Sequence, residues 1–414
     1  MAAIGIQRNK IETVLTKGSF PVIAGIIFSI SVFLIYSNTL QSPFLFDDHS
    51  NIVDNDLLKI DSLSWETLRD VWQAPHPCQR RKLANLSFAL NYVWEKHNTF
   101  GYHLFNVAIH LLCGLLIARF FRMLLTTERL SVRYTDSQRR WLAWIAAFVW
   151  ACHPVQINGV TYIVQRMTSM ATLFALLTMI AWLSGRKAWI RKGYGITSAW
   201  GALGIVFLYC GMLCKEIVAI VPGLILVTEY LLLREGQFKI GITFKTSIAL
   251  LTGLLVALVW IFYYFGPALL ERWMAGYSHR EFTLVERLMT QSRILWHYLS
   301  VFYFPLPGRF VLLHEYPISK GFLSPPSTMI SIVFWGITLI SMEIYRKRRP
   351  VLTWMTAWFL VSHLIESTII PLELIFEHRM YFPSVGLAFG TVLLGFNLFS
   401  RYRIPERSRA ILVV

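Results

Sequence analysis

Apolar runs long enough to cross a lipid bilayer recur along most of this chain. A membrane-spanning helix needs about 20 consecutive apolar residues, and lipid offers no hydrogen-bond partner to a backbone that is not helical or closed into a barrel. The runs lie at residues 19–37, 102–126, 141–153, 168–184, 196–213, 217–233, 243–265, 326–345, 351–366 and 381–400. The sequence therefore predicts an all-α polytopic membrane protein with about 10–12 transmembrane helices.

Composition supports this class and argues against nucleic-acid binding. Hydrophobic residues make up 55% of the chain and charged residues only 15%, which leaves too few polar residues to cover a water-soluble globule. The net charge of +16 is divided into short clusters between apolar runs, and the excess of Lys and Arg in cytoplasmic loops explains such clusters. The five cysteines, an odd number, indicate no disulfide or metal framework.

The distribution of basic residues predicts the orientation in the membrane. Most of the 39 Lys and Arg residues fall in six segments, which are 1–19, 118–140, 185–193, 234–245, 345–349 and 401–414. The positive-inside rule places these segments, and both termini, in the cytoplasm. The first large loop, 38–101, and the second, 266–325, then lie on the opposite face.

Two regions depart from a simple series of spans. Residues 154–167 continue a short span and begin with a proline, so we expect a bend or a re-entrant turn there. Residues 283–304 are rich in aromatic residues but contain Arg287, Arg293 and His297, which favours a helix lying in the membrane interface. In the first loop, 62–73 and 83–94 have the periodicity of amphipathic helices, with tryptophans suited to the interface.

Near its start, the first loop also contains the strongest candidates for catalytic residues, Asp47-Asp48-His49. A carboxylate at the membrane surface can act as a general base toward a hydroxyl, or hold a metal or a sugar hydroxyl; the alternative is a solvated loop start. Arg81 follows within the basic run 80–82. An arginine there can neutralise a phosphate, whereas the alternative is a surface that binds anionic lipid.

Other polar side chains occur at the ends of the spans. His103, Asn106 and His110 share one helical face; we expect interhelical hydrogen bonds, because no third metal ligand is recognisable. Arg166 lies in an apolar segment and requires an anion or an acid as partner, and the Lys215-Glu216 pair is a candidate for that contact. The remaining polar residues at span ends are His153 and the triplet Glu377-His378-Arg379.

The motifs taken together resemble membrane glycosyltransferases of the GT-C superfamily, in particular the transmembrane O-mannosyltransferases that target cadherins and their bacterial counterparts. The resemblance runs in order through residues 36–49, 81–92, 101–110, 153–166, 214–216, 291–298, 314–319 and 377–384. It implies a GT-C fold and an inverting transfer of one sugar from a polyprenyl-phosphate donor to a hydroxyl, on the non-cytoplasmic face.

The resemblance also implies roles for individual residues. Asp47 or Asp48 would be the base. The carboxylates themselves, rather than the resemblance, leave a divalent cation as an alternative, with Asp47 or Asp48 as its ligand; no other cofactor is expected. The phosphate of the donor would be bound by cationic side chains, namely Arg81 foremost, then Arg166, Lys215, Arg293 and Arg379. Further candidates for the substrate site are His49, His103, His153, Glu216, Glu377 and His378.

The sequence differs from that family in three respects. Relatives usually carry tetratricopeptide repeats, and we expect a single membrane domain over 1–414 without a soluble C-terminal domain. Lys82 replaces an expected proline, and Asn158 stands where relatives often have an acid. We therefore expect a periplasm-facing enzyme of a bacterial inner membrane, with a pilin-like protein or a cell-envelope glycan as acceptor.

Two functions of other classes remain as alternatives. A transporter or flippase of a lipid-linked sugar should carry its charges near the middle of the membrane, often with repeat symmetry. An assembly subunit without activity should show no dependence of sugar transfer on the aspartate pair.

Overall fold

The computed structural model describes residues 20–78, 80–233, 271 and 274–401, and within them the chain forms helices and no β-strand. The predicted span at 243–265 and the terminal segments 1–19 and 402–414 lie outside the described residues. The longer helices are α2 (Phe20–Tyr36), α3 (Trp65–Gln73), α4 (Lys82–Glu95), α5 (Thr99–Leu125), α7 (Asp136–Cys152), α9 (Arg166–Ile190), α10 (Tyr194–Met212), α11 (Val221–Thr228), α13 (Leu284–Tyr303), α14 (Ser327–Tyr345), α15 (Pro350–Ser362) and α16 (Pro383–Arg401).

Short helical segments connect these helices. They are η1 (Ser37–Thr39), η2 (His49–Val53), η3 (Asp56–Leu58), α6 (Glu128–Ser131), η4 (Pro154–Gln156), α8 (Ile157–Thr161), η5 (Ile163–Gln165), η6 (Glu216–Ile220), η7 (Glu229–Leu233), η8 (Tyr277–His279), η9 (Pro307–Arg309) and η10 (Glu377–Met380). Three of them contain candidate residues from the sequence: η2 begins at His49, η6 begins at Glu216, and η10 begins at Glu377.

Seven segments of the described chain are long and apolar enough to cross a membrane: Phe20–Thr39, Thr99–Leu125, Ile163–Ile190, Tyr194–Met212, Glu216–Leu233, Ser327–Tyr345 and Pro383–Ser400. Each predicted run within the described residues coincides with one of these, with the shorter apolar helix α15, or with α7, whose first turns carry Arg139 and Arg140. The prediction of an all-α polytopic membrane protein is confirmed.

Both irregular regions contain helices, and the first bends as Pro154 predicts. After α7 ends at Cys152, Pro154 opens η4, and α8 and η5 follow before α9 begins; proline cannot donate the backbone hydrogen bond that would continue α7. Residues 283–304 form α13, which starts with a capping box between Thr283 and Glu286. It is absent from the seven candidate spans of the described chain.

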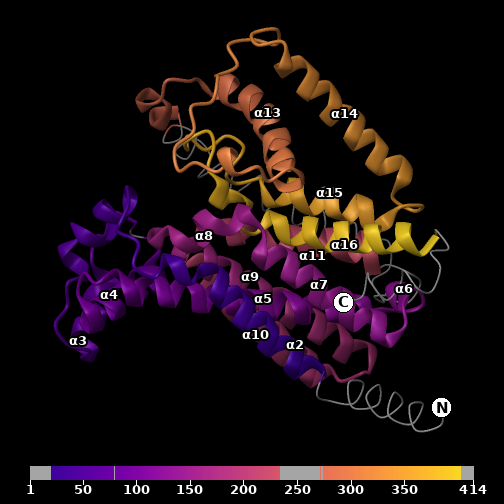
Figure 1. Ribbon diagram of the computed structural model, residues 1–414, viewed down its shortest axis with the longest axis horizontal. Coiled ribbons are helices and arrows are strands. Elements are labelled where there is room, and N and C mark those ends of the chain that lie inside the picture. Colours follow the sequence, from indigo (N-terminus) through magenta and orange to yellow (C-terminus); the bar gives the residue numbers. More distant parts are fainter. Residues whose placement is uncertain (1–19, 79, 234–270, 272–273, 402–414) are drawn as a thin grey trace.

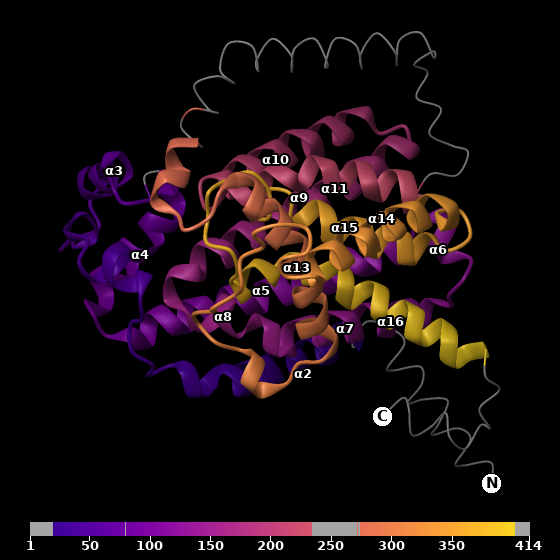
Figure 2. The ribbon, with the colours of Figure 1, turned by 90° about the horizontal axis from the view of Figure 1, so that it is seen from above.

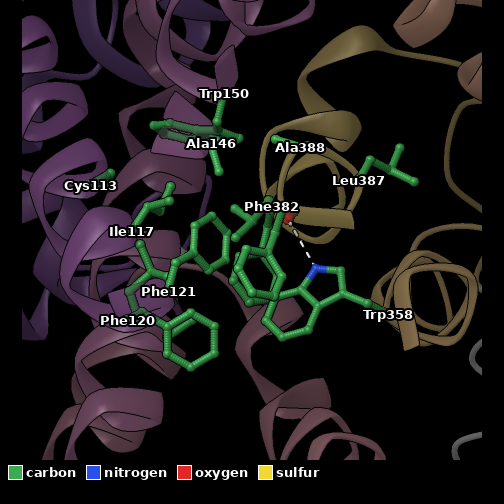
Figure 3. Close-up of a cluster of buried hydrophobic side chains, with 14 of the residues drawn as sticks. Cys113, Ile117, Phe120, Phe121, Ala146, Trp150, Trp358, Phe382, Leu387 and Ala388 are labelled. Carbon is green, nitrogen blue, oxygen red and sulfur yellow. Dashed lines mark hydrogen bonds between the residues drawn. The ribbon is translucent and has the colours of Figure 1, made fainter. Parts of the chain in front are cut away.

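Large aromatic side chains fill the core between α5, α7, α15 and α16 (Figure 3). Trp150 and Trp358 are fully buried, as are Phe120 and Phe121. Trp358 donates its indole N–H to the backbone oxygen of Phe382 at 3.5 Å, shown as the dashed line in Figure 3. The core thus joins the N-terminal and C-terminal helices into one bundle.

Close packing of α16 on α15 depends on two glycines. Gly386 and Gly390 are spaced as in a small-xxx-small motif, which lets membrane helices approach closely. A Cβ atom on Gly386 would lie 2.4 Å from the ring of Trp358, and one on Gly390 would lie 2.4 Å from the sulfur of Met355. No larger side chain fits at either position unless α15 shifts.

Helices α3 and α4 form one end of the molecule in both views (Figures 1 and 2). The capping box of α3 joins Ser64 and Thr67. One face of α4 points outward. The other face buries Phe88 and Ala89 in a second apolar cluster, which includes Tyr102 of α5 and Met167 of α9. This packing fixes the first loop against the bundle and positions the residues described next.

Candidate functional site

The adjacent aspartates of the first loop have opposite environments. Asp48 is buried, with 1% of its surface exposed, and its two carboxylate oxygens accept hydrogen bonds from the backbone N–H groups of Leu45 (3.0 Å) and Val164 (2.7 Å). The Asp47 side chain is exposed, while its backbone N–H donates to the Tyr162 hydroxyl at 2.8 Å. Asp48 therefore holds the loop against the start of α9, and Asp47 remains accessible.

A large polar cavity lies in front of Asp47. Its volume is about 1070 Å³, and segments that are far apart in the sequence line it. The lining comprises Asp47, His279, Arg280, Glu281, Phe282, Leu313, His314, Glu315, Tyr316, Pro317, Ile318, Glu373, Leu374, Ile375 and Phe376. A carboxylate facing a space of this size can reach the hydroxyl group of a bound acceptor.

Two ion pairs stand beside the first loop. Arg81, immediately before α4, contacts Glu216 at 3.3 Å and keeps about a quarter of its side chain exposed. The buried Lys215, between α10 and η6, contacts Glu366 at 2.8 Å and donates to the Thr168 hydroxyl at 3.0 Å. The two pairs bring α4, the start of η6 and the segment after α15 together.

Arg379 and His378 of η10 join this cluster. Burial lowers the pKa of His378, and the positive charges of Lys215, Arg379 and Arg81 lower it further, whereas Glu366 raises it. These charges therefore all lie near His378. The Nε atom of Arg379 is buried and has no hydrogen-bond partner within the described residues.

Cys78 links the cationic cluster to the exposed aspartate. Burial raises the pKa of its thiol, and the charges of Arg81, Glu216, Asp47 and Lys215 all act on it. The Cys78 Sγ donates to Asn51 Oδ1 at 3.2 Å, and Asn51 Nδ2 donates to the Asp47 backbone carbonyl at 2.8 Å. The backbone N–H of Arg81 donates to the Cys78 carbonyl at 3.0 Å. These contacts connect Asp47 with Arg81, whereas Arg81 and Lys215 do not line the cavity in front of Asp47.

Arg166 is placed differently from the expectation. It is fully buried, and its guanidinium donates to Asn106 Oδ1 (2.7 Å), Asn91 Oδ1 (2.6 Å), the Ser87 carbonyl (3.0 Å) and the Tyr102 carbonyl (3.0 Å). The prediction of an acid partner is wrong, because neutral oxygens of α4 and α5 occupy the donors. The pairing with Glu216 is also wrong, because Glu216 contacts Arg81.

The shared face of α5 makes hydrogen bonds to neighbouring segments, and the one between His110 and Ala151 of α7 joins two helices, as the spacing predicts. His103 Nε2 lies 3.0 Å from the Ser42 carbonyl. His110 places its two ring nitrogens 2.7 Å from the Tyr381 hydroxyl and 3.0 Å from the Ala151 carbonyl. Both histidines are buried away from the cavity lining. The described part of the chain contains no group of three or more His, Cys, Asp or Glu residues suited to a metal ion.

Glu377 and His153 connect the second large loop, 266–325, to the bundle. Glu377 accepts hydrogen bonds from Asn158 Nδ2 at 2.7 Å and from the backbone N–H of Val311 at 3.2 Å, and it contacts His314. His153 Nε2 lies 2.8 Å from the Phe302 carbonyl. Asn158, where an acid was expected, thus contacts an acid from another segment.

Arg293 and His49 lie at the margins of this region. Arg293 donates to the Pro317 carbonyl at 2.8 Å and lies 4.9 Å from the Tyr316 ring, so it supports a wall of the cavity. His49 is exposed in η2, immediately after the aspartate pair. Neither makes an ion pair within the described residues.

Two residues of the site had no role assigned from the sequence. Glu366 is the only charged residue of the run 351–366, and an acid in an apolar run is a signal of function or of a buried partner. His314 lines the cavity and contacts Glu377. His314 begins the motif 314–319 of the resemblance, but only its contact with Glu377 indicates what it does in the site.

The pH dependence of stability provides a test of the Asp48 environment. Burial raises the pKa of Asp48 from 3.8 to about 6, although the N–H groups of Leu45 and Val164 lower it. Folding therefore favours the protonated form, and this contribution to the unfolding free energy is present below about pH 4 and is lost as the pH rises through about 6. We expect the thermal unfolding midpoint in detergent, followed by tryptophan fluorescence, to fall over that range. An identical slope in Asp48→Asn would contradict this assignment.

Comparison with known proteins identifies relatives of about half the chain. Protein O-mannosyl-transferase Tmtc3 of Drosophila melanogaster is 31% identical over 217 residues, which are 48% of this chain and 23% of that protein. Protein O-mannosyl-transferase TMTC3 of Mus musculus is 32% identical over 202 residues, 47% of this chain and 20% of that protein. Protein O-mannosyl-transferase TMTC4 of Homo sapiens is 26% identical over 221 residues, 50% of this chain and 28% of that protein.

The matched segment thus spans between 20% and 28% of these three relatives. No protein-family model and no solved structure matches the chain. The resemblance to the O-mannosyltransferases is confirmed by these relatives, whose names describe sugar transfer to protein.

Proposed function

We propose that this protein is an inverting glycosyltransferase, which moves a monosaccharide from a polyprenyl-phosphate carrier to a hydroxyl group of a protein on the non-cytoplasmic face. The observation that carries the proposal is the position of Asp47, an exposed carboxylate that lines a cavity of about 1070 Å³. The similarity to protein O-mannosyl-transferases supports the reaction class and a protein acceptor.

Asp47 is the better candidate for the general base. A base must lie within hydrogen-bond distance of the hydroxyl proton that it removes. Both oxygens of Asp48 already accept backbone hydrogen bonds and the side chain is buried, so Asp48 orients the loop. The Asp47 carboxylate, one residue earlier, would take the proton while the hydroxyl oxygen attacks the anomeric carbon.

The cationic cluster would stabilise the departing polyprenyl phosphate. Arg81 is the member with an exposed portion, and its guanidinium can bind a phosphate oxygen while it contacts Glu216. Lys215 and Arg379 are buried behind it and would add positive potential where negative charge develops. Arg166 and Arg293 would position the walls of the site, because the described oxygens already engage their donors.

The periplasmic face of a bacterial inner membrane is our proposed location, and a pilin-like protein or another exported protein is the proposed acceptor. The clusters of Lys and Arg at the opposite ends of the spans support this orientation. A transporter is less well supported, because Arg81, Asp47 and Glu216 gather at one end of the bundle rather than at its middle.

Purified protein provides a direct test. With a synthetic polyprenyl-phosphate mannose and a Ser/Thr-rich acceptor peptide, we expect a hexose mass increment on the peptide and release of polyprenyl phosphate, both measured by mass spectrometry. The same comparison on surface proteins of cells with and without the gene identifies the natural sugar and acceptor. If the protein moved the donor lipid across vesicles without transferring sugar to any peptide or envelope glycan, the proposal would fail.

A further inference from the structure

A second cavity lies at the end of the bundle opposite the candidate site. It has a volume of about 650 Å³ and lies between the start of α2, the end of α5 and the start of α7. Its walls are mostly apolar, and the α2 wall includes Val22, Ile26 and Ile30, each more than half exposed. The proposed transfer reaction uses none of these residues.

Three arginines line the same cavity. Arg119 and Arg122 come from α5, and Arg140 comes from α7. Arg122 and Arg140 both contact the carboxylate of Asp136, which also lies 3.4 Å from Arg139. Asp136 therefore contacts three guanidinium groups, and Arg119 adds a further exposed positive charge.

Arg122 also has a donor without a partner. Its Nη1 atom is buried and has no hydrogen-bond acceptor within the described part of the chain, although its Nη2 atom contacts Asp136. A buried guanidinium nitrogen without an acceptor is costly unless a ligand or water supplies one. An anion above Arg122 and Arg119 would supply that acceptor.

We propose that this cavity binds an anionic phospholipid, with the headgroup phosphate between Arg119 and Arg122 and an acyl chain along the apolar wall of α2. Charge complementarity supports this occupant, because basic pockets between membrane helices bind anionic headgroups. The mostly apolar walls of the cavity favour a lipid over free phosphate. The headgroup would lie at the membrane surface opposite the cavity that Asp47 lines.

Lipid binding to the purified full chain tests the proposal. In a neutral detergent, we expect dioleoylphosphatidylglycerol to bind, as counted by native mass spectrometry, and to raise the thermal unfolding midpoint. Dioleoylphosphatidylcholine and inorganic phosphate should do neither. Arg119→Gln should weaken phosphatidylglycerol binding about fivefold, since one basic residue near the surface contributes this order of affinity.

A second variant tests the apolar wall of the cavity. Gly25 lies in this wall, and a Cβ atom at this position would lie 3.6 Å from the ring of Trp144. Gly25→Phe should therefore fill space that the acyl chain would otherwise occupy. We expect it to weaken phosphatidylglycerol binding as well, measured in the same way.

Arg348→Gln is the matched control. Arg348 is exposed in the turn between α14 and α15 and does not line the cavity. The positive-inside rule places its segment, 345–349, on the same side of the membrane as Arg119. We expect it to leave binding unchanged. Equal binding of the two lipids, full competition by inorganic phosphate, or an equal loss in Arg348→Gln and Arg119→Gln would each overturn the proposal.

Discussion

Asp47→Asn is expected to lower the rate of sugar transfer by about 10²- to 10⁴-fold, the usual contribution of a positioned general base. Asparagine keeps the size of the side chain but cannot take the proton of the acceptor. The backbone N–H of residue 47 would still donate to Tyr162, and the buried contacts of Asp48 would persist. The measurement is single-turnover transfer to the peptide, with donor binding assayed separately.

Asp54→Asn is the matched control for that experiment. Asp54 is an exposed aspartate of the same loop and does not line the cavity in front of Asp47. Its replacement should leave the rate within about twofold, because solvent-exposed surface changes have small effects. Full activity in Asp47→Asn, or an equal loss in Asp54→Asn, would exclude Asp47 as the base.

Arg166→Met is expected to lower the unfolding free energy by about 3 kcal/mol or more, because each buried oxygen left without a donor costs about 1–3 kcal/mol. The side chains of Asn106 and Asn91 and the Ser87 carbonyl would lose their guanidinium partner. The favourable contact of the cation with Phe88, 4.6 Å from the ring centroid, would also be lost. Denaturant or thermal unfolding in detergent measures the change.

Arg81→Gln separates this structural role from a role in phosphate binding. The Arg81–Glu216 pair is partly exposed, and such pairs contribute about 0–1 kcal/mol to stability. We therefore expect Arg81→Gln to fold like the wild type but to transfer sugar more slowly. If instead Arg166→Met were as stable as Arg81→Gln, the assignment of Arg166 as a structural cation would be wrong.

The helices and their buried faces could be predicted from the sequence, because each membrane helix depends mainly on its own residues. Every backbone group in the membrane must be paired within its own helix, so an apolar run of sufficient length already specifies its structure. The spacing of His103 and His110 likewise predicted a buried face, and the structure confirms it. Pro154 marked the bend after α7 for an equally local reason.

The sequence did not predict which polar residues pair with one another. Lys215 pairs with Glu366 and Arg81 with Glu216, contacts that join segments far apart in the sequence. Local spacing carries no information on such pairs, and it suggested an acid for Arg166 where the structure has amide and carbonyl oxygens. A buried cation needs acceptors of any kind, and only the packing of α4 on α5 and α9 supplies them.

Asp47 and Asp48 show most clearly the difference between what the sequence predicts and what the tertiary structure decides. The sequence determined that two carboxylates follow the end of the first apolar run, near the membrane surface. Only the tertiary structure decided that Asp48 turns inward to the N–H of Val164 and that Asp47 faces the cavity. Adjacent residues of one type are chemically alike, and the distinction arises from what the rest of the folded chain places around each of them.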